Sequence, residues 1–181
     1  MLNAERKTMN KIIFIGGIHG SGKGTICNQT SKDFEIPHFS CSKLLKWEEL
    51  SSISNKKVDD FEVTQNRLLN GIRSNISPEK LTLLDGHFCL LNQEGTPEKI
   101  EEQTFTDINP ILIAIVTEDV NTIHDRLENR DGNSYELDIL DKMQQLEYSQ
   151  AKAVSNLLTI PLIELNSKNI EEFHKFIKSN K

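Results

Sequence analysis

A glycine-rich loop with one lysine follows the first apolar run of the chain. The run covers residues 11–16, and the next nine residues read GIHGSGKGT. Glycines let a backbone turn with its N–H groups aimed inward, and a helix N-terminus after such a loop adds partial positive charge. We therefore expect the loop to bind a polyphosphate through these residues: Gly17, Ile18, His19, Gly20, Ser21, Gly22, Lys23, Gly24 and Thr25.

The spacing within this loop matches the phosphate-loop pattern as far as the lysine. Gly17 and Gly22 stand five apart and Lys23 follows, but Gly24 comes next and the hydroxyl is displaced to Thr25. Lys23 would reach the terminal phosphates as a point charge. The alternative, an ordinary glycine turn with a surface lysine, does not explain the preceding strand and the spacing together. We expect His19 to fill a loop position rather than to act as a base.

Two further groups of residues have the chemistry that a polyphosphate site needs. Asp85 ends an apolar run, at the sheet edge where ligands of open α/β sheets collect, and can hold water ligands of Mg²⁺; Thr25 is a second candidate metal ligand. Arg126 and Arg130 are four residues apart, so they project from one helix face and can neutralise a transferred phosphoryl group. The alternatives are a capped turn at Asp85 and surface ion pairs for the arginines.

Strand and helix patterns alternate along the whole chain. Apolar runs predict strands at residues 11–16, 36–39, 80–86, 110–118 and 160–165. Apolar residues at helical spacing, and the breaks that bound such segments, predict helices along the chain. The expected helices lie from about residue 25, within 41–50, over 59–74, near 97–105, over 136–159 and over 170–179. Another is expected to run from an N-cap at Thr117 to about residue 130. This alternation indicates an α/β fold with a parallel sheet.

Composition limits the classes of protein that this chain can belong to. Its 181 residues suit one domain, and a formal net charge of −6 without a basic block argues against nucleic-acid binding. The three cysteines form no Cys-x-x-Cys pair, so neither a zinc cluster nor a disulfide framework is indicated. Since no apolar run is long enough for a membrane span or a signal peptide, we expect a cytoplasmic protein with no membrane partner.

The motifs resemble those of nucleoside monophosphate kinases. The ending of the loop, Gly22-Lys23-Gly24-Thr25, and the strand-end sequence LLDG at 83–86 are similar to that family, and the later segments DGHF, INPILIAIVTED and RLENRD look more like archaeal-type adenylate kinases. The resemblance implies a three-layer P-loop fold with a five-stranded parallel sheet, helices on both faces, a short helical lid at 126–137 and Mg²⁺ as cofactor.

The resemblance also implies an acceptor-binding segment at residues 40–77, within a single domain 1–181 whose residues 1–10 form a flexible extension. A solvated polar helix face is the alternative for that segment, and a structural hydrogen bond is the alternative for the histidine that matches the archaeal-type pattern. The candidate acceptor-binding residues are Ser40, Lys46, Gln65, Arg67 and His87.

The chain departs from the family pattern in its arginines. None occurs after Arg130, and none follows the pair Asp85-Gly86. Each missing cation removes a charge-assisted contact of roughly 1.5–3 kcal/mol, so ATP binding is better supported than AMP as acceptor. Our leading hypothesis is an ATP-dependent kinase of a small acceptor, a nucleoside monophosphate first. A regulatory ATP- or GTP-binding protein with slow hydrolysis, and a kinase of a non-nucleotide small molecule, are the alternatives.

Overall fold

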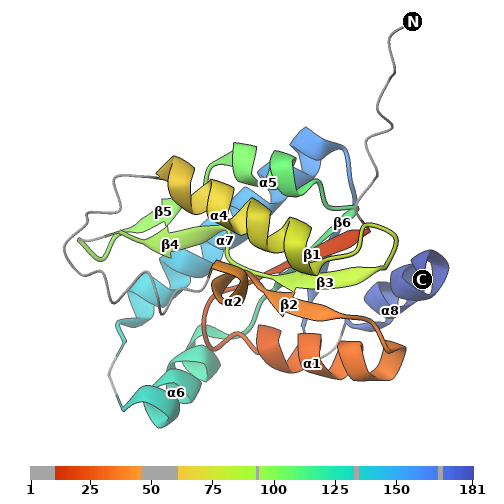
Figure 1. Cartoon of the computed structure of the whole chain (residues 1–181). Coiled ribbons are helices and arrows are strands. Elements are labelled where there is room, and N and C mark those ends of the chain that lie inside the picture. The colour runs from red at the N-terminus through yellow and green to blue at the C-terminus, as the bar shows by residue number, and fades with distance from the viewer. Residues whose placement is uncertain (1–10, 46–60, 93, 133–134, 167–168) are drawn as a thin grey trace, which may run out of the picture.

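Five parallel strands form the centre of the molecule, as the sequence predicts. The computed structural model describes residues 11–45, 61–92, 94–132, 135–166 and 169–181; the expected extension 1–10 lies outside them. The strand order is β2-β3-β1-β6-β7 (Figure 1). The strands are β1 (Ile12–Gly16), β2 (His38–Ser40), β3 (Thr82–Asp85), β6 (Leu112–Val116) and β7 (Leu162–Leu165).

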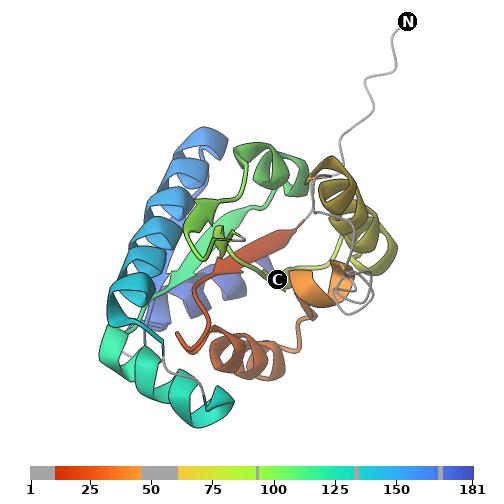
Figure 2. The same ribbon diagram turned by 90° about the vertical axis from the view of Figure 1, so that its left-hand side faces the viewer.

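Helices cover both faces of this sheet. The helices of the described residues are α1 (Lys23–Phe34), α2 (Cys41–Leu45), α4 (Phe61–Asn75), α5 (Glu102–Ile108), α6 (Val120–Asp131), α7 (Leu137–Leu158) and α8 (Glu171–Asn180). Helices α4, α5 and α7 pack on one face and α1 and α8 on the other (Figures 1 and 2). Every residue of β1 and β6 is buried, which explains why both strands are apolar throughout.

Alternate residues of β1 supply the two halves of the core. Phe14 points to the face of α4, α5 and α7, where its ring meets those of Phe88 and Phe105 edge to face at 5.1 and 5.3 Å. Ile13 and Ile15 point to the face of α1 and α8. This alternation is the normal pleat of a strand, and it fixes the register in which Ile15 lies opposite Asp85 of β3.

A β-hairpin follows β3 where the sequence suggested a loop and then a helix near 97–105. Strands β4 (Cys89–Leu91) and β5 (Pro97–Lys99) pair antiparallel, and α5 begins only at Glu102. The turn is closed by the Asn92 side chain, which accepts hydrogen bonds from the N–H groups of Glu94 and Thr96, both at 3.0 Å. The prediction of a helix at 97–101 was therefore wrong.

The start of α6 also differs from the prediction. Thr117 is not the N-cap, because its N–H still pairs with Leu165 of β7. Asp119 is the cap instead, and its carboxylate accepts the N–H of Thr122 at 3.0 Å. The expected lid, 126–137, falls partly on the end of α6 and partly on residues 133–134, which are outside the described residues. No helix in the described parts of the chain is long and apolar enough to cross a membrane.

Candidate active site

The glycine-rich loop connects β1 to α1 at the carboxyl edge of the sheet. Gly17 has φ 147°, and a Cβ there would lie 2.8 Å from the carbonyl oxygen of Val116, so only glycine fits. Gly22 has φ 93° and is the N-cap of α1, and no side chain accepts its first N–H groups. The start of α1, at Lys23 rather than near Thr25, thus presents free N–H donors to the loop, as a bound phosphate requires.

Two buried side chains hold the loop in place. Ile18 packs with Ile123 and Leu127 of α6 and with Met143 of α7, and it is 2% exposed. Ser21 is also buried, while Gly24 and Thr25 are exposed. Apolar contacts of Ile18 therefore hold the loop against α6 and α7, while Gly24 and Thr25 remain exposed.

Lys23 and Asp85 come together, as their positions at neighbouring strand ends predict. The Lys23 ammonium is buried, donates to the carbonyl oxygen of Gly86 and lies 3.8 Å from Oδ1 of Asp85. The lysine of the loop and the carboxylate of β3 therefore lie side by side at the carboxyl ends of the strands. Lys23 thus points toward the end of β3 rather than to solvent.

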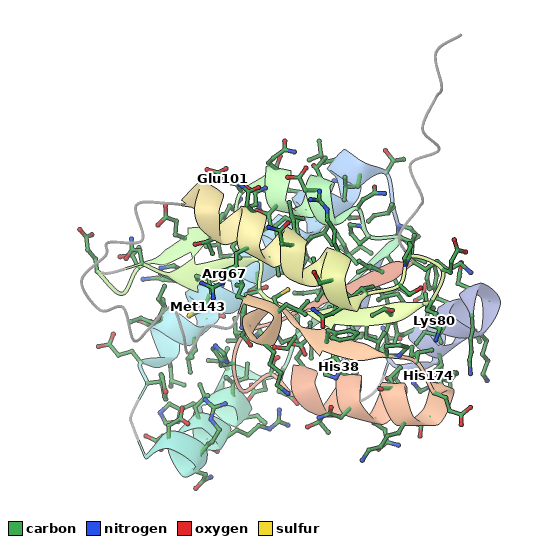
Figure 3. All side chains as sticks on the ribbon, in the orientation of Figure 1. His38, Arg67, Lys80, Glu101, Met143 and His174 are labelled. Atoms are coloured by element: carbon green, nitrogen blue, oxygen red, sulfur yellow. The ribbon has the colours of Figure 1, made fainter. Side chains whose placement is uncertain are left out.

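His38, which the sequence analysis did not single out, completes this group. Its Nε2 lies 2.5 Å from Oδ2 of Asp85, and both side chains are 17% exposed (Figure 3). Burial alone would raise the pKa of Asp85, but the hydrogen bond with His38 and the charge of Lys23 outweigh it and hold this pKa below its usual range. The predicted strand 36–39 contains His38, but no strand order was predicted, so the sequence analysis did not place His38 beside Asp85.

Two histidine rings, one from the glycine-rich loop and one from the segment after β3, lie close together. The rings of His19 and His87 are 4.6 Å apart, and Nδ1 of His87 lies 3.3 Å from Oε1 of Glu147 on α7. Glu147 is 1% exposed and also accepts the N–H groups of Phe88 and Cys89. This buried carboxylate, which the sequence analysis did not single out, holds the segment after Asp85 through these backbone groups.

The pKa of His19 is lowered mainly by desolvation. Burial, followed by the charges of His87, Lys23 and Arg130, lowers the pKa of His19 to about 4, while Glu147 acts in the opposite direction. His19 is therefore neutral at neutral pH. Lys23 and Arg130, from α1 and α6, both act on this imidazole of the loop through their charge.

The two arginines of α6 have different partners. Arg126 donates to the carbonyl oxygen of Gly20 at 3.1 Å and to Glu118 at 3.0 Å, so it braces the loop. Arg130 donates twice to Asp131, at 2.6 and 2.7 Å, and this pairing raises the pKa of Arg130. Tyr135 donates to the same carboxylate. Arg126 thus contacts the loop directly, while Arg130 lies at the solvent-exposed end of α6 and acts on His19 through its charge.

The predicted acceptor-binding residues do not form one cluster in the described part of the chain. Ser40 lies at the end of β2, 2.6 Å from Oγ of Ser42, close to the Asp85 end of the sheet. Gln65 of α4 donates to Asp107 of α5 at 2.9 Å, and Arg67 lies on α4 (Figure 3). Lys46 lies outside the described residues. Ser40 and His87 are therefore the predicted acceptor residues placed nearest to Asp85.

A thiol, an imidazole and a carboxylate also lie close together here. The ligand atoms of Cys27, His38 and Asp85 all lie within 4.8 Å of one another. Burial raises the pKa of the Cys27 thiol to about 12, and the ammonium of Lys23 lies beside the same carboxylate. A zinc ion would have to displace the proton of the Cys27 thiol and lie next to the positive charge of Lys23. These three residues therefore do not fit a resident zinc ion.

These features define a P-loop kinase-like α/β fold, and comparison with known proteins agrees. A family model described as "AAA domain" matches residues 16–144, and the chain belongs to this family. A shikimate kinase from Acinetobacter baumannii, solved in complex with shikimate, has a TM-score of 0.61 at 16% identity, with 96% of each chain covered. This likeness shows the fold.

Two other solved structures have lower scores. A gluconokinase from Sinorhizobium meliloti has a TM-score of 0.47 at 12% identity, covering 85% of this chain and 96% of its own. An uncharacterised protein from Eubacterium ventriosum has 0.49 at 19% identity, covering 93% and 98%. No curated protein matches the sequence at a significant level.

Proposed function

We propose that this protein is an ATP-dependent phosphotransferase that moves the γ-phosphoryl group to a small acceptor. The observation that supports this most is the meeting of Lys23, from the glycine loop, with Asp85 at the end of β3. Cleavage or transfer of a terminal phosphoryl group needs a cation for the migrating group and an acidic residue that holds the water ligands of Mg²⁺, and this pair supplies both. The acceptor panel below separates transfer from hydrolysis.

The proposed reaction uses the residues around the loop in separate roles. An acceptor oxygen attacks the γ-phosphorus, the bond from that phosphorus to the β–γ bridging oxygen breaks, and ADP leaves; where the acceptor is a hydroxyl, its proton passes to solvent. Lys23 follows the migrating group, and Arg126 and Arg130 neutralise charge from the α6 side. The loop N–H groups bind the remaining phosphates. Arg126 can serve in this way because it already contacts Gly20.

The site also suits Mg²⁺, which we propose as the cofactor. Asp85 is ionised because its pKa is held low, and Thr25 offers an exposed hydroxyl in the first turn of α1, so the donors are the oxygen ligands that Mg²⁺ prefers. Lys23 and His38 flank the carboxylate, which favours contact through water rather than direct ligation by Asp85. When bound, Mg²⁺ would neutralise charge on the β- and γ-phosphates.

For the acceptor, the resemblance to archaeal-type adenylate kinases makes a nucleoside monophosphate our first candidate. A non-nucleotide alcohol is the second candidate, and two observations favour it. No arginine follows Arg130, and among the described residues on the β2 side Asp85 pairs with His38 and lies opposite Ser40. Such groups suit hydroxyls better than a second phosphate. The shikimate complex of the structural neighbour is consistent with this candidate.

An acceptor panel tests the proposal. Purified protein is given ATP and Mg²⁺ with single nucleoside monophosphates and small polyols, and ADP formation is followed. We expect one acceptor class to accelerate ADP formation, and Lys23→Ala to abolish it. Lys32→Ala, which changes an exposed lysine at the other end of α1, is the matched control. Slow ADP formation at one rate with every acceptor would instead support a regulatory NTPase.

A further inference from the structure

Asp85 has a different partner on each of its two carboxylate oxygens. Oδ2 bonds to Nε2 of His38, and Oδ1 faces the ammonium of Lys23. The terminal torsion of an aspartate is broad, so a carboxylate without partners samples many orientations. In the proposed reaction Lys23 turns to the transferred phosphoryl group, and His38 then stays as the partner that sets the carboxylate plane.

The fold holds His38 rigidly for this task. Its strand β2 is hydrogen-bonded to β3, beginning with the Leu83 N–H, which donates to the carbonyl oxygen of Pro37 at 2.9 Å. Pro37 has a restricted φ and precedes His38 directly. On the other side, the fully buried thiol of Cys27 on α1 lies within 4.8 Å of the imidazole nitrogen. The pairing of β2 with β3 and the neighbouring thiol thus keep the imidazole beside Oδ2 of Asp85.

We infer that His38 is a positioning residue for phosphoryl transfer, which fixes Asp85 so that Oδ1 faces the phosphate and metal side of the site. This inference rests on the proposed function. It assigns no contact between His38 and the reacting atoms. A purely structural pair that joins β2 to β3 is the competing explanation, and it predicts a loss of stability without a selective loss of turnover.

The test compares two amides at position 38. Glutamine places its amide nitrogen about where Nε2 stands and can donate to Asp85, whereas asparagine is one carbon shorter and does not reach it. We expect His38→Gln to retain most of the wild-type kcat. His38→Asn should lower kcat on the order of 10–100-fold, the usual effect of removing a residue that orients a ligand. The affinity for ADP without metal should be unchanged in both.

The controls separate positioning from folding. His124→Gln changes a histidine on α6 that pairs only with its helix neighbours Asp125 and Glu128, and it should behave like the wild type. Thermal unfolding shows whether each variant folds. In an Asp85→Asn background, His38→Asn should cause no further loss of kcat. Equal kcat in the Gln and Asn variants, or a full additional loss in the Asp85→Asn background, would overturn the inference.

A calorimetric measurement keeps the inference testable if no acceptor is phosphorylated, a result that would reject the proposed function alone. ADP affinity is measured with and without Mg²⁺ in the same variants. We expect Mg²⁺ to tighten ADP binding in the wild type and in His38→Gln, and to do so less in His38→Asn. The same Mg²⁺ effect in all three proteins would show that His38 does not position Asp85.

Discussion

At the scale of single residues, the candidate site consists of side chains that come from different helices and strands. Lys23 comes from the start of α1, Asp85 from the end of β3 and His38 from β2, and each touches another because β1, β3 and β2 are neighbours in the sheet. Residues far apart in the sequence thus form one charged group of lysine, carboxylate and imidazole. Their separate roles can be tested by changes that keep their shape.

Asp85→Asn should preserve ADP binding without Mg²⁺ but reduce turnover. The amide fills the same space, but it loses the charge that attracts Lys23 and the water ligands of Mg²⁺, so we expect kcat to fall on the order of 10–100-fold. Steady-state kinetics and ADP calorimetry check this together. Asp33→Asn, an exposed change on α1, is the control. Unchanged turnover in Asp85→Asn would remove Asp85 from the site.

The three cysteines should be unreactive in the folded protein. Burial raises the pKa of each thiol, Cys27, Cys41 and Cys89, to about 12. At pH 8 each thiol therefore keeps its proton, and the reactive thiolate is scarce. Titration with a disulfide reagent should release no rapid thiol from native protein and three from protein in denaturant. A rapid native phase would contradict the raised pKa of these thiols.

At the scale of elements, α6 and α7 hold the glycine loop from one side. The side chain of Gln144 on α7 donates to the carbonyl oxygen of Glu118 at 2.8 Å and accepts the N–H of Glu118 at 3.0 Å. Glu118 in turn accepts a hydrogen bond from Arg126, which contacts Gly20. This chain of contacts links α7 to the loop through the connection between β6 and α6.

Gln144→Leu should therefore weaken both stability and nucleotide binding. It leaves the two polar backbone groups of Glu118 without their partner, at a cost of about 1–3 kcal/mol for unsatisfied groups. We expect a lower midpoint in denaturant and weaker ADP binding. The neighbouring exposed change Gln145→Leu should leave both near wild type, because Gln145 bonds only to Asp141 one turn earlier. Equal effects of Gln144→Leu and Gln145→Leu on the denaturation midpoint and on ADP binding would show that the hydrogen bonds between Gln144 and Glu118 do not support the loop.

Elements with strong patterns could be predicted from the sequence, and those with weak patterns could not. The runs of β1 and β6 and the period of α7 are long and apolar, so their positions agree with the prediction. The hairpin of β4 and β5 was missed because its strands have three residues each and include Pro97 and Lys99. The cap at Asp119 was missed because Thr117 and Asp119 are both good cap residues, and only the pairing of Thr117 with β7 decides between them.

The candidate site, like the fold, could be predicted only in part from the sequence. The loop and Asp85 are recognisable because their types and spacing are local signals. His38 and Glu147 are not, since each acquires its partners only when distant segments pack. For Glu147 those partners are on residues 87–89, about sixty positions away in the sequence. Sequence reasoning therefore singled out the proposed phosphate-binding residues and not the residues that support them.

At the scale of the whole molecule, the two helical layers stabilise the sheet that carries the site. On the α1 and α8 face, Phe173 and Ile177 are fully buried against Ile13 and Ile15 of β1. The chain from Glu171 onward thus completes the core beneath the strand that ends at the glycine loop. Loss of this contact should affect the folding of the whole domain rather than of α8 alone.

Phe173→Ala should destabilise the protein by about 3–5 kcal/mol, the usual cost of removing a buried phenylalanine. Phe176→Ala, at a partly buried position of the same helix, should cost clearly less. Urea unfolding followed by circular dichroism measures both. Two separate transitions in Phe173→Ala, with α8 lost first, would contradict its place in one cooperative core.

The measurement that tests the central claim most directly is the fate of the γ-phosphoryl group. Protein is incubated with Mg²⁺, γ-labelled ATP and the acceptor that most accelerates ADP formation, and the products are separated and counted. The account predicts that label appears on the acceptor in step with ADP, and that Lys23→Ala abolishes both. Label found only as inorganic phosphate, at a rate that no acceptor changes, would contradict a phosphotransferase and support a nucleotide-hydrolysing switch.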